Sequence, residues 1–302
     1  MSDKLDIAVV VLTYNEEIHI RRCLENIRQF SDRIFVVDSF STDRTVEIAK
    51  EMGAVVAQNK WENNHAKQFN WGLDHLPFDS KWILRLDADE YLYPETIAEI
   101  RELIPTLPDD VTSLSMPRAL VWMGKTIRFG TGKVILTRFF RRGFGRSEEK
   151  LMDEHIVTSS GRNLQLKGAF VDDNLNDLSW WAHKHVNYAV REAVDLLNIE
   201  YGFLEQGSET SNLNRQAACK RNRKCRYARL PLFWRSFAYF LYRYFLRGGF
   251  LEGKRGFLWH FLQGWWYRTL VDAKVFEIKR DCGGDPGRIA AYVEEKYHIS
   301  LR

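Results

Sequence analysis

Long apolar runs and closely spaced cysteines are both missing from this 302-residue sequence. No uncharged run approaches the ~20 residues that a membrane-spanning helix needs, so we expect a chain that does not cross a bilayer. Cys23, Cys219, Cys225 and Cys282 show no C-x-x-C spacing, which argues against a zinc site and a disulfide framework. The apolar stretch near the N-terminus is too short for a signal peptide and lacks a small-residue cleavage site. These absences indicate a cytoplasmic protein with reduced thiols.

The first half of the sequence alternates apolar segments with amphipathic ones. Strands are predicted at residues 6–13, 33–38, 54–58 and 82–87, because these runs are short, apolar and rich in β-branched residues. Segments with helical periodicity separate them, and further helices are expected over 94–105 and 177–205. This alternation is typical of an α/β fold with a mostly parallel, Rossmann-like sheet.

Polar residues follow three of these predicted strands. They are Thr13, Tyr14, Asn15 and Glu16 after the first, Asp38, Ser39, Ser41, Thr42 and Asp43 after the second, and Asp87, Asp89 and Glu90 after the fourth. Because ligands of open α/β sheets bind beyond the carboxyl ends of the strands, we expect these side chains to form one site. A nucleotide lying across the tips would stack its base on Tyr14 and give its ring N–H to Asp38. Its diphosphate would then reach Asp87 and Asp89.

The three acids after the fourth strand need an explanation, because neighbouring carboxylates repel one another and also repel phosphates. One alternative is a helix cap, in which Asp89 or Glu90 favours the start of the helix at Pro94. The other is a bridging Mg²⁺ or Mn²⁺, whose oxygen ligands would come from both the protein and the phosphates. The polar residues at the neighbouring tips favour the second alternative, a divalent cation held by Asp87 and Asp89.

Three ordered segments carry a family resemblance: VVVLTYNEE at 9–17, IFVVDSFSTDRTVEIAKEMGA at 34–54 and WILRLDADE at 82–90. They resemble the successive signatures of family 2 glycosyltransferases, which have the GT-A fold, and the match covers roughly residues 6–100. The resemblance is closest to bacterial members that build lipopolysaccharide core, capsule and exopolysaccharide chains. It implies a metal-dependent hexosyl- or N-acetylhexosaminyltransferase that inverts the anomeric centre.

The resemblance also assigns roles to the matching residues. Thr13, Tyr14 and Glu16 resemble the first nucleotide-contacting motif, Asp38 resembles the uracil-binding aspartate, and Asp87 and Asp89 resemble the D-x-D pair, of which the second is usually the metal ligand. One position departs from the family, since Phe69 stands where a basic residue often precedes the Asn of the helix before the D-x-D. Lys67 or Arg85 would then supply the charge that faces the phosphates.

A further carboxylate is needed to take the proton from the attacking hydroxyl. Asp153 or Glu154, in the segment KLMDEHIV, is the candidate base, because the family places its base in an acidic motif after the D-x-D. Partial burial would raise the pKa of either carboxyl toward a useful value. The competing interpretation is a surface loop with a helix cap. His155 is either a neighbour of the base or a structural partner of the acids.

Aromatic and basic residues around the predicted base are candidates for binding the acceptor. They suit sugar stacking and phosphate pairing, and they suit a plain basic strand surface as well. Trp180 and Trp181 fit packing better than binding. The candidates are Trp122, Arg128, Arg138, His155 and His183, with Lys184 and Asn187 on the same predicted helix as His183.

The composition changes after a polar segment at 206–214. Residues 215–229 contain seven Lys or Arg and no acid. On the helix that follows, Phe233, Phe237, Phe240, Leu241 and Tyr244 would share one face, and Arg235, Arg243 and Arg247 the other. Nucleic-acid binding fits the charge but lacks an accompanying motif, and a face packed on the catalytic domain is a second alternative. We favour a third, in which aromatic residues dip into an anionic membrane surface and arginines meet its head groups.

These observations predict a GT-A catalytic domain over 1–210, with nucleotide-sugar binding in 1–100 and the acceptor side in 110–210. A helical, membrane-associating region is predicted over 211–302. The expected reaction moves a sugar from a UDP-linked donor to a glycan or polyprenyl-linked saccharide at the cytoplasmic face of the inner membrane. A sugar nucleotidyltransferase is disfavoured because TYNEEIHI, after the first strand, contains no glycine for a phosphate loop. A non-catalytic nucleotide-sugar-binding protein is disfavoured by the intact set of acids.

Overall fold

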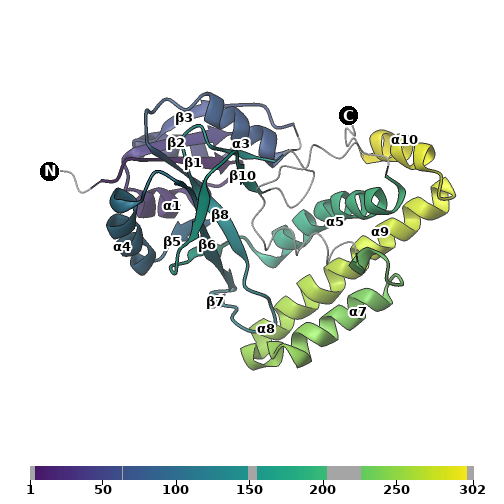
Figure 1. The fold of residues 1–302 in the computed structure, drawn as a ribbon. Coiled ribbons are helices and arrows are strands. Elements are labelled where there is room, and N and C mark those ends of the chain that lie inside the picture. Colours follow the sequence, from purple (N-terminus) through teal and green to yellow (C-terminus); the bar gives the residue numbers. More distant parts are fainter. Residues whose placement is uncertain (1–3, 63, 149–154, 203–225, 298–302) are drawn as a thin grey trace.

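The computed structural model describes residues 4–62, 64–148, 155–202 and 226–297. Figure 1 shows two parts side by side: a sheet flanked by helices, and a group of helices that begins with α5 (Leu178–Tyr201). We call the described residues from Leu178 to Tyr297 the helical region. Every helix in the described ranges is too short or too polar to traverse a membrane.

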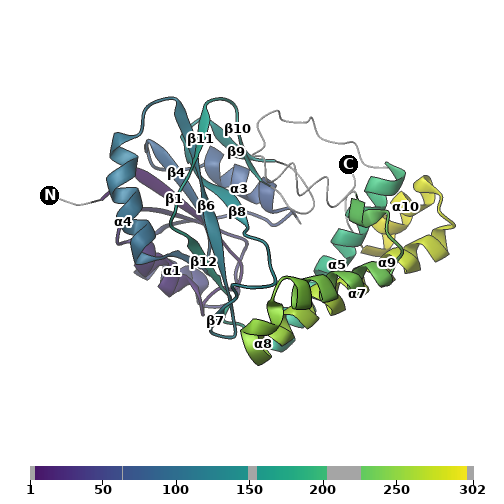
Figure 2. The same ribbon diagram turned by 60° about the horizontal axis from the view of Figure 1, so that its bottom comes forward.

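One half of the sheet is parallel and matches the sequence prediction. Its order is β3-β2-β1-β4, with β1 at Ile7–Thr13, β2 at Arg33–Asp38, β3 at Val55–Gln58 and β4 at Trp82–Asp87. The accompanying helices are α1 (Ile20–Ile27), α2 (Thr45–Glu51), α3 (His65–Asp74) and α4 (Pro94–Leu103). Figure 2 shows α1 and α4 on one face of the sheet and α3 on the other, so β1, β2 and β4 are buried on both faces, whereas β3 at the edge is partly exposed. The carboxyl ends of these strands meet at one edge.

Beyond β4 the sheet becomes mixed. β8 (Ile135–Arg141) lies antiparallel between β4 and β6 (Val111–Trp122), and β12 (Phe170–Asp173) runs parallel to β6 and antiparallel to β5 (Glu90–Leu92). Four short strands complete the description. β7 (Lys125–Thr126) and β11 (Arg162–Gln165) pair with β6, and β9 (Gly145–Ser147) pairs with β10 (Ile156–Thr158). Because the chain between β6 and β8, residues 123–134, contains the short strand β7 and no crossover helix, the two strands can lie as antiparallel neighbours.

The helical region has an apolar core of its own. α5 packs against α9 (Tyr267–Cys282) and α10 (Pro286–Tyr297), and the three helices bury Leu197, Val271 and Ile289 among others. Between them lie α7 (Trp234–Leu241), the short helical turns η2 (Tyr242–Leu246) and η3 (Gly249–Glu252), α8 (Gly253–Trp259) and η4 (His260–Trp266). α5 thus packs with the C-terminal helices although it precedes the predicted domain boundary at residue 210. The boundary itself lies outside the described residues.

Two arginines of the helical region point inward, which contradicts the predicted arrangement of basic and apolar faces. Arg235 and Arg243 are only 4% and 5% exposed. The guanidinium of Arg235 lies 2.6 Å from Asp272 of α9, and its Nε donates to the same carboxylate at 2.7 Å. Asp272 is fully buried as well, and its carboxylate supplies the counter-charge that a buried arginine requires. The prediction that these two arginines face lipid head groups is wrong.

A buried glutamate fastens the helical region to the turn between β7 and β8. Glu252 accepts hydrogen bonds from the backbone N–H groups of Arg128 and Phe129 at 2.6 and 2.9 Å. Its other oxygen lies 2.7 Å from the ammonium of Lys125. Burial by itself would raise the pKa of Glu252, but these three contacts outweigh burial and lower the pKa. Glu252 therefore remains ionised and keeps all three contacts at neutral pH.

Next to Glu252, a histidine ring is wedged between two glycines. His260 is fully buried, and burial lowers its pKa to about 4, so the ring is neutral. A Cβ added to Gly130 would lie 2.2 Å from the ring, and one added to Gly249 would lie 2.5 Å from it. Neither position accepts a side chain, so the backbone after β7 and the backbone of η3 contact the ring directly. We call His260, Gly130, Gly249 and Glu252 the joint.

Candidate functional site

The tips of β1 and β2 are tied together by one buried carboxylate. Asp38 is fully buried and accepts hydrogen bonds from Thr13 Oγ1 at 2.9 Å and from Gln58 Nε2 at 3.0 Å. The backbone N–H and the hydroxyl of Ser41 donate to the same carboxylate. These four donors fix the position of the Asp38 carboxylate between the two strand tips. To bind a ring N–H of a nucleotide, as the sequence predicted, Asp38 would exchange one of these bonds for the new contact.

The loop after β1 presents an aromatic ring to solvent. Tyr14 is 59% exposed, whereas Thr13 before it is buried. Asn15 has a left-handed φ of +55°, a conformation that Asn tolerates better than most residues. Its side chain accepts from Thr42 N at 2.8 Å, and its N–H donates to Ser41 Oγ at 2.9 Å. The loop is therefore anchored at its base, and the ring of Tyr14 is open to a stacking partner.

The turn between β4 and β5 carries three acids in different surroundings. Glu90 is buried and forms an ion pair with Arg138 on β8, and its Oε2 accepts from Asp87 N at 3.0 Å. Asp87 lies 3.8 Å from Arg85 Nε, and its side chain is 41% exposed. The residue before α4 is Tyr93, which makes no capping hydrogen bond. The helix-cap alternative for these acids is therefore wrong.

Residues after β12 hold the third of these acids in place. Asn174 Nδ2 donates to Asp89 Oδ2 at 2.9 Å, and Asp173 N donates to Asp89 O at 3.2 Å. Arg22 of α1 also donates to Asp89 O, at 3.3 Å, and lies 2.6 Å from the carboxylate of Asp173. Such supporting contacts fix the direction of a ligating carboxylate. No local pattern pointed to them, because Asn174 lies 85 positions from Asp89.

The sequence analysis missed Asp172, which belongs to the same edge of the sheet. Its carboxylate accepts from Arg118 Nη1 at 3.2 Å. Burial, together with the neighbouring Asp89, raises the pKa of Asp172 to about 6. For Asp87, by contrast, the opposing effect of burial is outweighed by Arg85 and other cations, which lower its pKa. The signal that would have revealed Asp172 is an apolar run ending in acids, as in β4.

A lysine of the helical region reaches this cluster. Lys184, on α5, lies 4.5 Å from the ring centre of Trp180. Burial by itself would lower the pKa of Lys184, but Tyr188 and the carboxylates of Asp89 and Glu16 raise it. The lysine is therefore charged and lies within electrostatic reach of the acids at the sheet edge. It was named on the sequence only as a neighbour on the helix of a predicted acceptor residue.

A buried histidine links the first motif to the chain after β12. His19 is fully buried; its Nε2 accepts from Leu175 N at 2.8 Å, so its Nδ1 carries the hydrogen that it shares with Glu16 at 2.5 Å. Glu16 N donates to Thr45 Oγ1 at 2.7 Å. Burial raises the pKa of Glu16, and the hydrogen bond from His19 partly offsets this effect. Glu16 is thus positioned by three separate segments.

The two residues predicted to face the phosphates lie in different places. Lys67 is exposed on α3 and lies 3.4 Å from Glu62. Arg85 is buried beside Asp87, with its guanidinium 5.1 Å from the ring centre of Phe69. Of the two, only Arg85 belongs to the acid-rich edge.

Three predicted acceptor residues lie toward the helical region. Trp122 is buried, and its ring centre lies 5.4 Å from that of Trp181 and 5.2 Å from that of Trp259, so its ring is used in packing between the two parts. Arg128 has an exposed side chain, and its backbone contacts the joint. His183 is exposed on α5. Arg138, the fourth, is buried beside Glu90 as described above.

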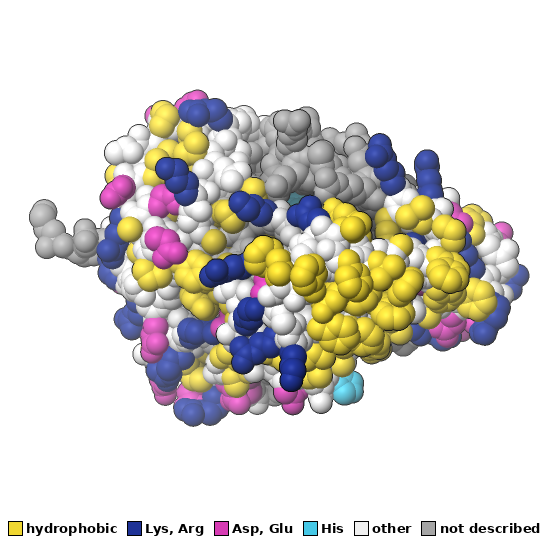
Figure 3. Space-filling view, turned by 90° about the horizontal axis from the view of Figure 1, so that it is seen from below, with side chains coloured by type: hydrophobic (Ala, Val, Ile, Leu, Met, Phe, Trp, Pro, Cys, Tyr) yellow, Lys and Arg dark blue, Asp and Glu magenta, His cyan; other side chains and the backbone are white. Residues whose placement is uncertain are grey.

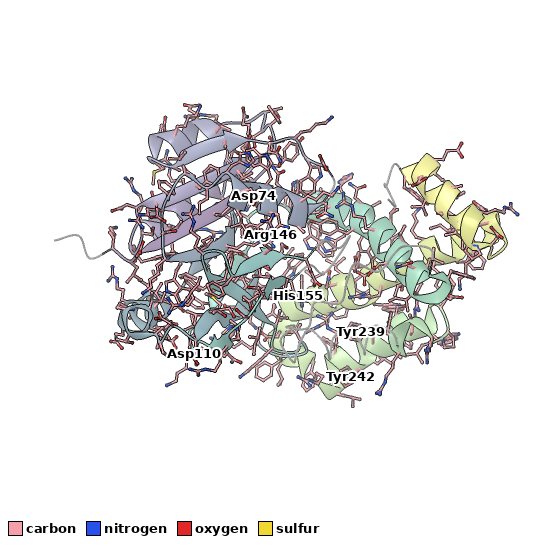
Figure 4. All side chains as sticks on the ribbon, turned by 45° about the horizontal axis from the view of Figure 1, so that its top comes forward. Asp74, Asp110, Arg146, His155, Tyr239 and Tyr242 are labelled. Atoms are coloured by element: carbon pink, nitrogen blue, oxygen red, sulfur yellow. The ribbon has the colours of Figure 1, made fainter. Side chains whose placement is uncertain are left out.

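The predicted base cannot be placed, because Asp153 and Glu154 lie outside the described residues. His155 is partly buried, and its N–H donates to Glu148 Oε1 at 3.1 Å. Figure 4 shows His155 between the sheet and the helical region. In the same view Asp74 and Arg146 lie together on the outside of the sheet domain, where two hydrogen bonds of 2.7 and 2.9 Å join them.

The acids at the edge fit a divalent cation that is shared with a ligand. Within the described ranges, no group of three or more His, Cys, Asp and Glu side chains is arranged to hold a metal by itself. Asp87 and Asp89 offer two carboxylates at one strand tip, and Mg²⁺ and Mn²⁺ prefer such oxygen ligands. Phosphate oxygens of a bound nucleotide can supply the remaining ligands. The donor set therefore suits a cation bound together with a diphosphate.

Comparisons with known proteins agree with this geometry. Residues 8–155 match the model of glycosyl transferase family 2. An uncharacterized glycosyltransferase of Rickettsia typhi is 35% identical over 104 residues, which are 34% of this chain and 35% of the relative. The SPbeta prophage-derived glycosyltransferase SunS of Bacillus subtilis is 31% identical over 108 residues, 35% of this chain and 25% of SunS. The chain thus matches about a third or less of the length of these relatives.

Two solved structures were also found to be similar. The mannosyltransferase PcManGT from Pyrobaculum calidifontis, in complex with GDP-Man and Mn²⁺, is 15% identical with a TM-score of 0.49, covering 90% of this chain and 87% of its own. Glucosyl-3-phosphoglycerate synthase from Mycobacterium tuberculosis, in complex with Mn²⁺, UDP and glucosyl-3-phosphoglycerate, is 20% identical with a TM-score of 0.32, covering 37% and 43%. The predicted fold class, a GT-A-like α/β domain followed by a helical, aromatic region, is confirmed by the family match and the element order. The segment that carries the site, residues 8–155, is the part of the chain that matches the model of glycosyl transferase family 2.

Proposed function

We propose that this protein transfers a sugar from a nucleotide diphosphate sugar, UDP-linked, to a hydroxyl group of a saccharide, with inversion at the anomeric carbon. The observation that supports the proposal is the meeting of Thr13, Asp38, Asp87 and Asp89 at the carboxyl edge of a parallel half-sheet in a family 2 domain. A nucleotide ligand is expected at this edge of an open α/β sheet.

The donor would be bound by three sets of groups. The base would stack on the exposed ring of Tyr14, and Asp38 would accept the ring N–H. Asp87 and Asp89 would hold Mg²⁺ or Mn²⁺ together with the diphosphate, and the bound cation would offset the negative charge that develops on the leaving oxygen. Lys184 would add a second positive charge at the same edge, which favours a diphosphate over a neutral ligand.

In the reaction, the oxygen of an acceptor hydroxyl would form a bond to the anomeric carbon from the face opposite the diphosphate. The bond between that carbon and the diphosphate oxygen would break, and the nucleoside diphosphate would leave with the electron pair. Asp153 or Glu154 would take the hydroxyl proton as general base. Both lie outside the described residues, so this assignment rests on the family resemblance alone.

The proposal extends to the acceptor and the cellular setting. The resemblance of three ordered segments to enzymes of lipopolysaccharide core, capsule and exopolysaccharide synthesis supports a hexose or N-acetylhexosamine as the transferred sugar. It also supports a glycan or polyprenyl-linked saccharide as the acceptor, used at the cytoplasmic face of the inner membrane. Because Arg138 and Trp122 are buried, we restrict the acceptor side to His155, His183 and Arg128.

A screen of UDP-sugars tests the proposal. The full chain would be incubated with each donor in Mn²⁺, in Mg²⁺ and in EDTA, and released UDP would be measured. We expect metal-dependent release with one donor class, and a loss of about 100-fold or more in Asp89→Ala. Asp74→Ala, far from the edge, serves as the matched acid control and should retain activity. Pyrophosphate release from UTP and a sugar phosphate would identify a nucleotidyltransferase, and donor binding unaffected by EDTA and by Asp89→Ala would contradict the proposal.

A further inference from the structure

A broad apolar surface covers one side of the helical region. Figure 3 shows hydrophobic side chains gathered there into a continuous band, with Lys and Arg along part of its margin. The most exposed members are Leu246 at 80% and Trp234 at 72%. Contiguous exposed apolar patches of this kind mark a contact surface for another molecule. The acid-rich edge of the sheet is a separate feature, so the surface has no role in the chemistry proposed above.

One part of this surface lies around η2 and η3. We call Phe129, Phe245, Leu246, Phe250 and Leu251 the apolar tip; all five are exposed. The inner side of this turn is occupied, because Gly130 N donates to Arg247 O at 2.9 Å and Gly249 lies against His260. The side chains of the tip therefore cannot pack on the inner side of the turn, and they point outward.

The outward direction of the apolar side chains continues along α7. The inner side of α7 and of the following η2 holds Arg235 and Arg243, and the buried Asp272 neutralises the first of them. The outer face accordingly carries Trp234 and Leu241, followed by Tyr242 in η2. Figure 4 labels Tyr239 and Tyr242 along this helix. The buried side of this stretch thus holds two arginines together with Phe240, and its outer side exposes large aromatic and aliphatic residues.

The charge around the surface has one sign. Between residues 226 and 271 the sequence contains eight Lys or Arg and a single acid, Glu252, which is buried in the joint. Five of the basic side chains are exposed: Arg226, Arg229, Arg247, Lys254 and Arg255. An apolar surface built from a segment whose exposed charges are all basic complements an anionic partner. Such a surface would repel a second copy of itself, which disfavours a dimer through this face.

A small hollow in the surface has the same character. It has a volume of about 400 Å³ and is lined by Tyr244, Gly253, Lys254, Phe257 and Leu258. Four of these residues offer aromatic, aliphatic or backbone surface, and the fifth places an ammonium group at the rim. An acyl chain below a phosphate matches this pairing of an apolar wall with one cation.

We propose that this surface docks on an anionic lipid bilayer. The apolar tip inserts among the acyl chains, and Arg247, Lys254 and Arg255 lie at the level of the lipid phosphates. This arrangement differs from the one predicted from the sequence, because the buried arginines of α7 stabilise the fold and the basic residues beside the tip meet the head groups. The joint ties the tip to the turn after β7, so docking also fixes how the catalytic sheet stands above the membrane. That a lipid-linked acceptor is served there rests on the proposed function, whereas the docking itself does not.

Vesicle sedimentation with the full chain tests the docking. Vesicles of phosphatidylcholine alone would be compared with vesicles in which half of the lipid is phosphatidylglycerol. We expect binding to the anionic vesicles to exceed binding to the neutral ones by about tenfold at low salt. The affinity of the double variant F245S/L246S for the anionic vesicles should fall by about tenfold or more, since the variant loses two large apolar side chains.

Matched controls separate insertion from charge and from misfolding. Val55→Ser removes an exposed apolar side chain from β3, far from the tip, and should bind as wild type. K254Q/R255Q should remove most of the preference for anionic lipid and the salt dependence. All variants should keep wild-type thermal unfolding and, if the proposed function holds, wild-type UDP release.

Three results would overturn the docking proposal. They are no sedimentation of the wild type with either vesicle, unchanged binding by F245S/L246S, and a dimer in light scattering that F245S/L246S disperses. Failure of UDP release with intact vesicle binding would count against the proposed function and leave the docking in place. Loss of vesicle binding with intact UDP release on a soluble acceptor would do the reverse.

Discussion

The sheet edge and the helical region each contain an arginine buried beside an acid, yet the two pairs have different surroundings. In the helical region Asp272 receives Arg235 and the N–H of Phe233 at 2.7 Å, and both charges are almost fully buried. At the sheet edge Glu90 receives Arg138, but Asp87 and other acids crowd the same place and raise its pKa in addition to burial.

This difference separates a structural pair from a poised one. A buried ion pair with matched charges contributes mainly by avoiding the cost of an unpaired charge. A cluster in which acids outnumber nearby cations stores repulsion that a bound cation would relieve. The comparison therefore predicts that acids of the helical region matter for stability, whereas acids of the sheet edge matter for ligand binding.

The largest expected effect is on stability, from Asp272→Ala. Leaving Arg235 buried without its partner should lower the free energy of unfolding by about 3–5 kcal/mol. Urea unfolding followed by circular dichroism measures this change. The control replaces both residues with leucine, which should cost much less because no charge is left unpaired. A loss below about 1 kcal/mol in the single variant would remove the contrast with the sheet edge.

The next largest effect is on ligand binding, from Asp89→Asn, and unlike Asp272→Ala this change should not lower the stability. Asp89→Asn should weaken Mn²⁺-dependent UDP binding by about 100-fold, equivalent to about 2.7 kcal/mol, because one of the two carboxylates is lost. In metal-free buffer its free energy of unfolding should stay level or rise, since a crowded charge is removed. Calorimetric titration and urea unfolding give the two numbers. Asn174→Ala, which only removes the support of Asp89, should cost about tenfold in binding.

The pH dependence of stability offers a third test, through Asp172. Because the pKa of Asp172 is raised to about 6, its stabilising contribution is complete below the ordinary value of 3.8 and is lost as pH rises through 6. Asp172→Asn cannot ionise and escapes this loss. In EDTA, the stability of the variant relative to wild type should increase by about 2–3 kcal/mol between pH 4 and pH 8. A difference that stays constant across this range would show that Asp172 is not crowded by its neighbours.

The smallest effect is expected for the exposed pair of Asp74 and Arg146. Both side chains are more than half exposed, so solvent screens the pair despite its two hydrogen bonds. Asp74→Ala should lower the free energy of unfolding by less than about 1 kcal/mol and should leave UDP binding unchanged. A larger loss of either would mean that geometry outweighs exposure in this protein.

Local sequence patterns predicted the parallel strands and the polar residues at their tips. β1, β2 and β4 are short, mostly apolar runs that end in polar residues, and these features depend only on neighbouring positions. The same reasoning placed Arg235 and Arg243 on an outward face, which is wrong, and left open a helix cap by Asp89 or Glu90, which the structure does not form. Glu90 instead pairs with Arg138, 48 positions away, and Arg235 pairs with Asp272, 37 positions away.

The rest of the site depends on contacts that no local pattern encodes. Asn174 supports Asp89, Leu175 binds His19, and Lys184 reaches across from α5 only because the mixed half of the sheet brings the end of β12 beside β5. An amphipathic pattern states that two faces differ, but the direction of each face is decided by the packing partner. For α7 that partner was a buried acid, which reversed the expected orientation.

The wedged imidazole sets a limit on what this molecule could reach. Glycine backbone lies on both sides of His260, so only the rigid imidazole ring separates the turn after β7 from η3 and the tip. Once the tip is seated, the reactive edge would stand at one height above the lipid phosphates. The protein would then select acceptors by length: those whose free hydroxyl lies at that height would react, and longer or shorter ones would not.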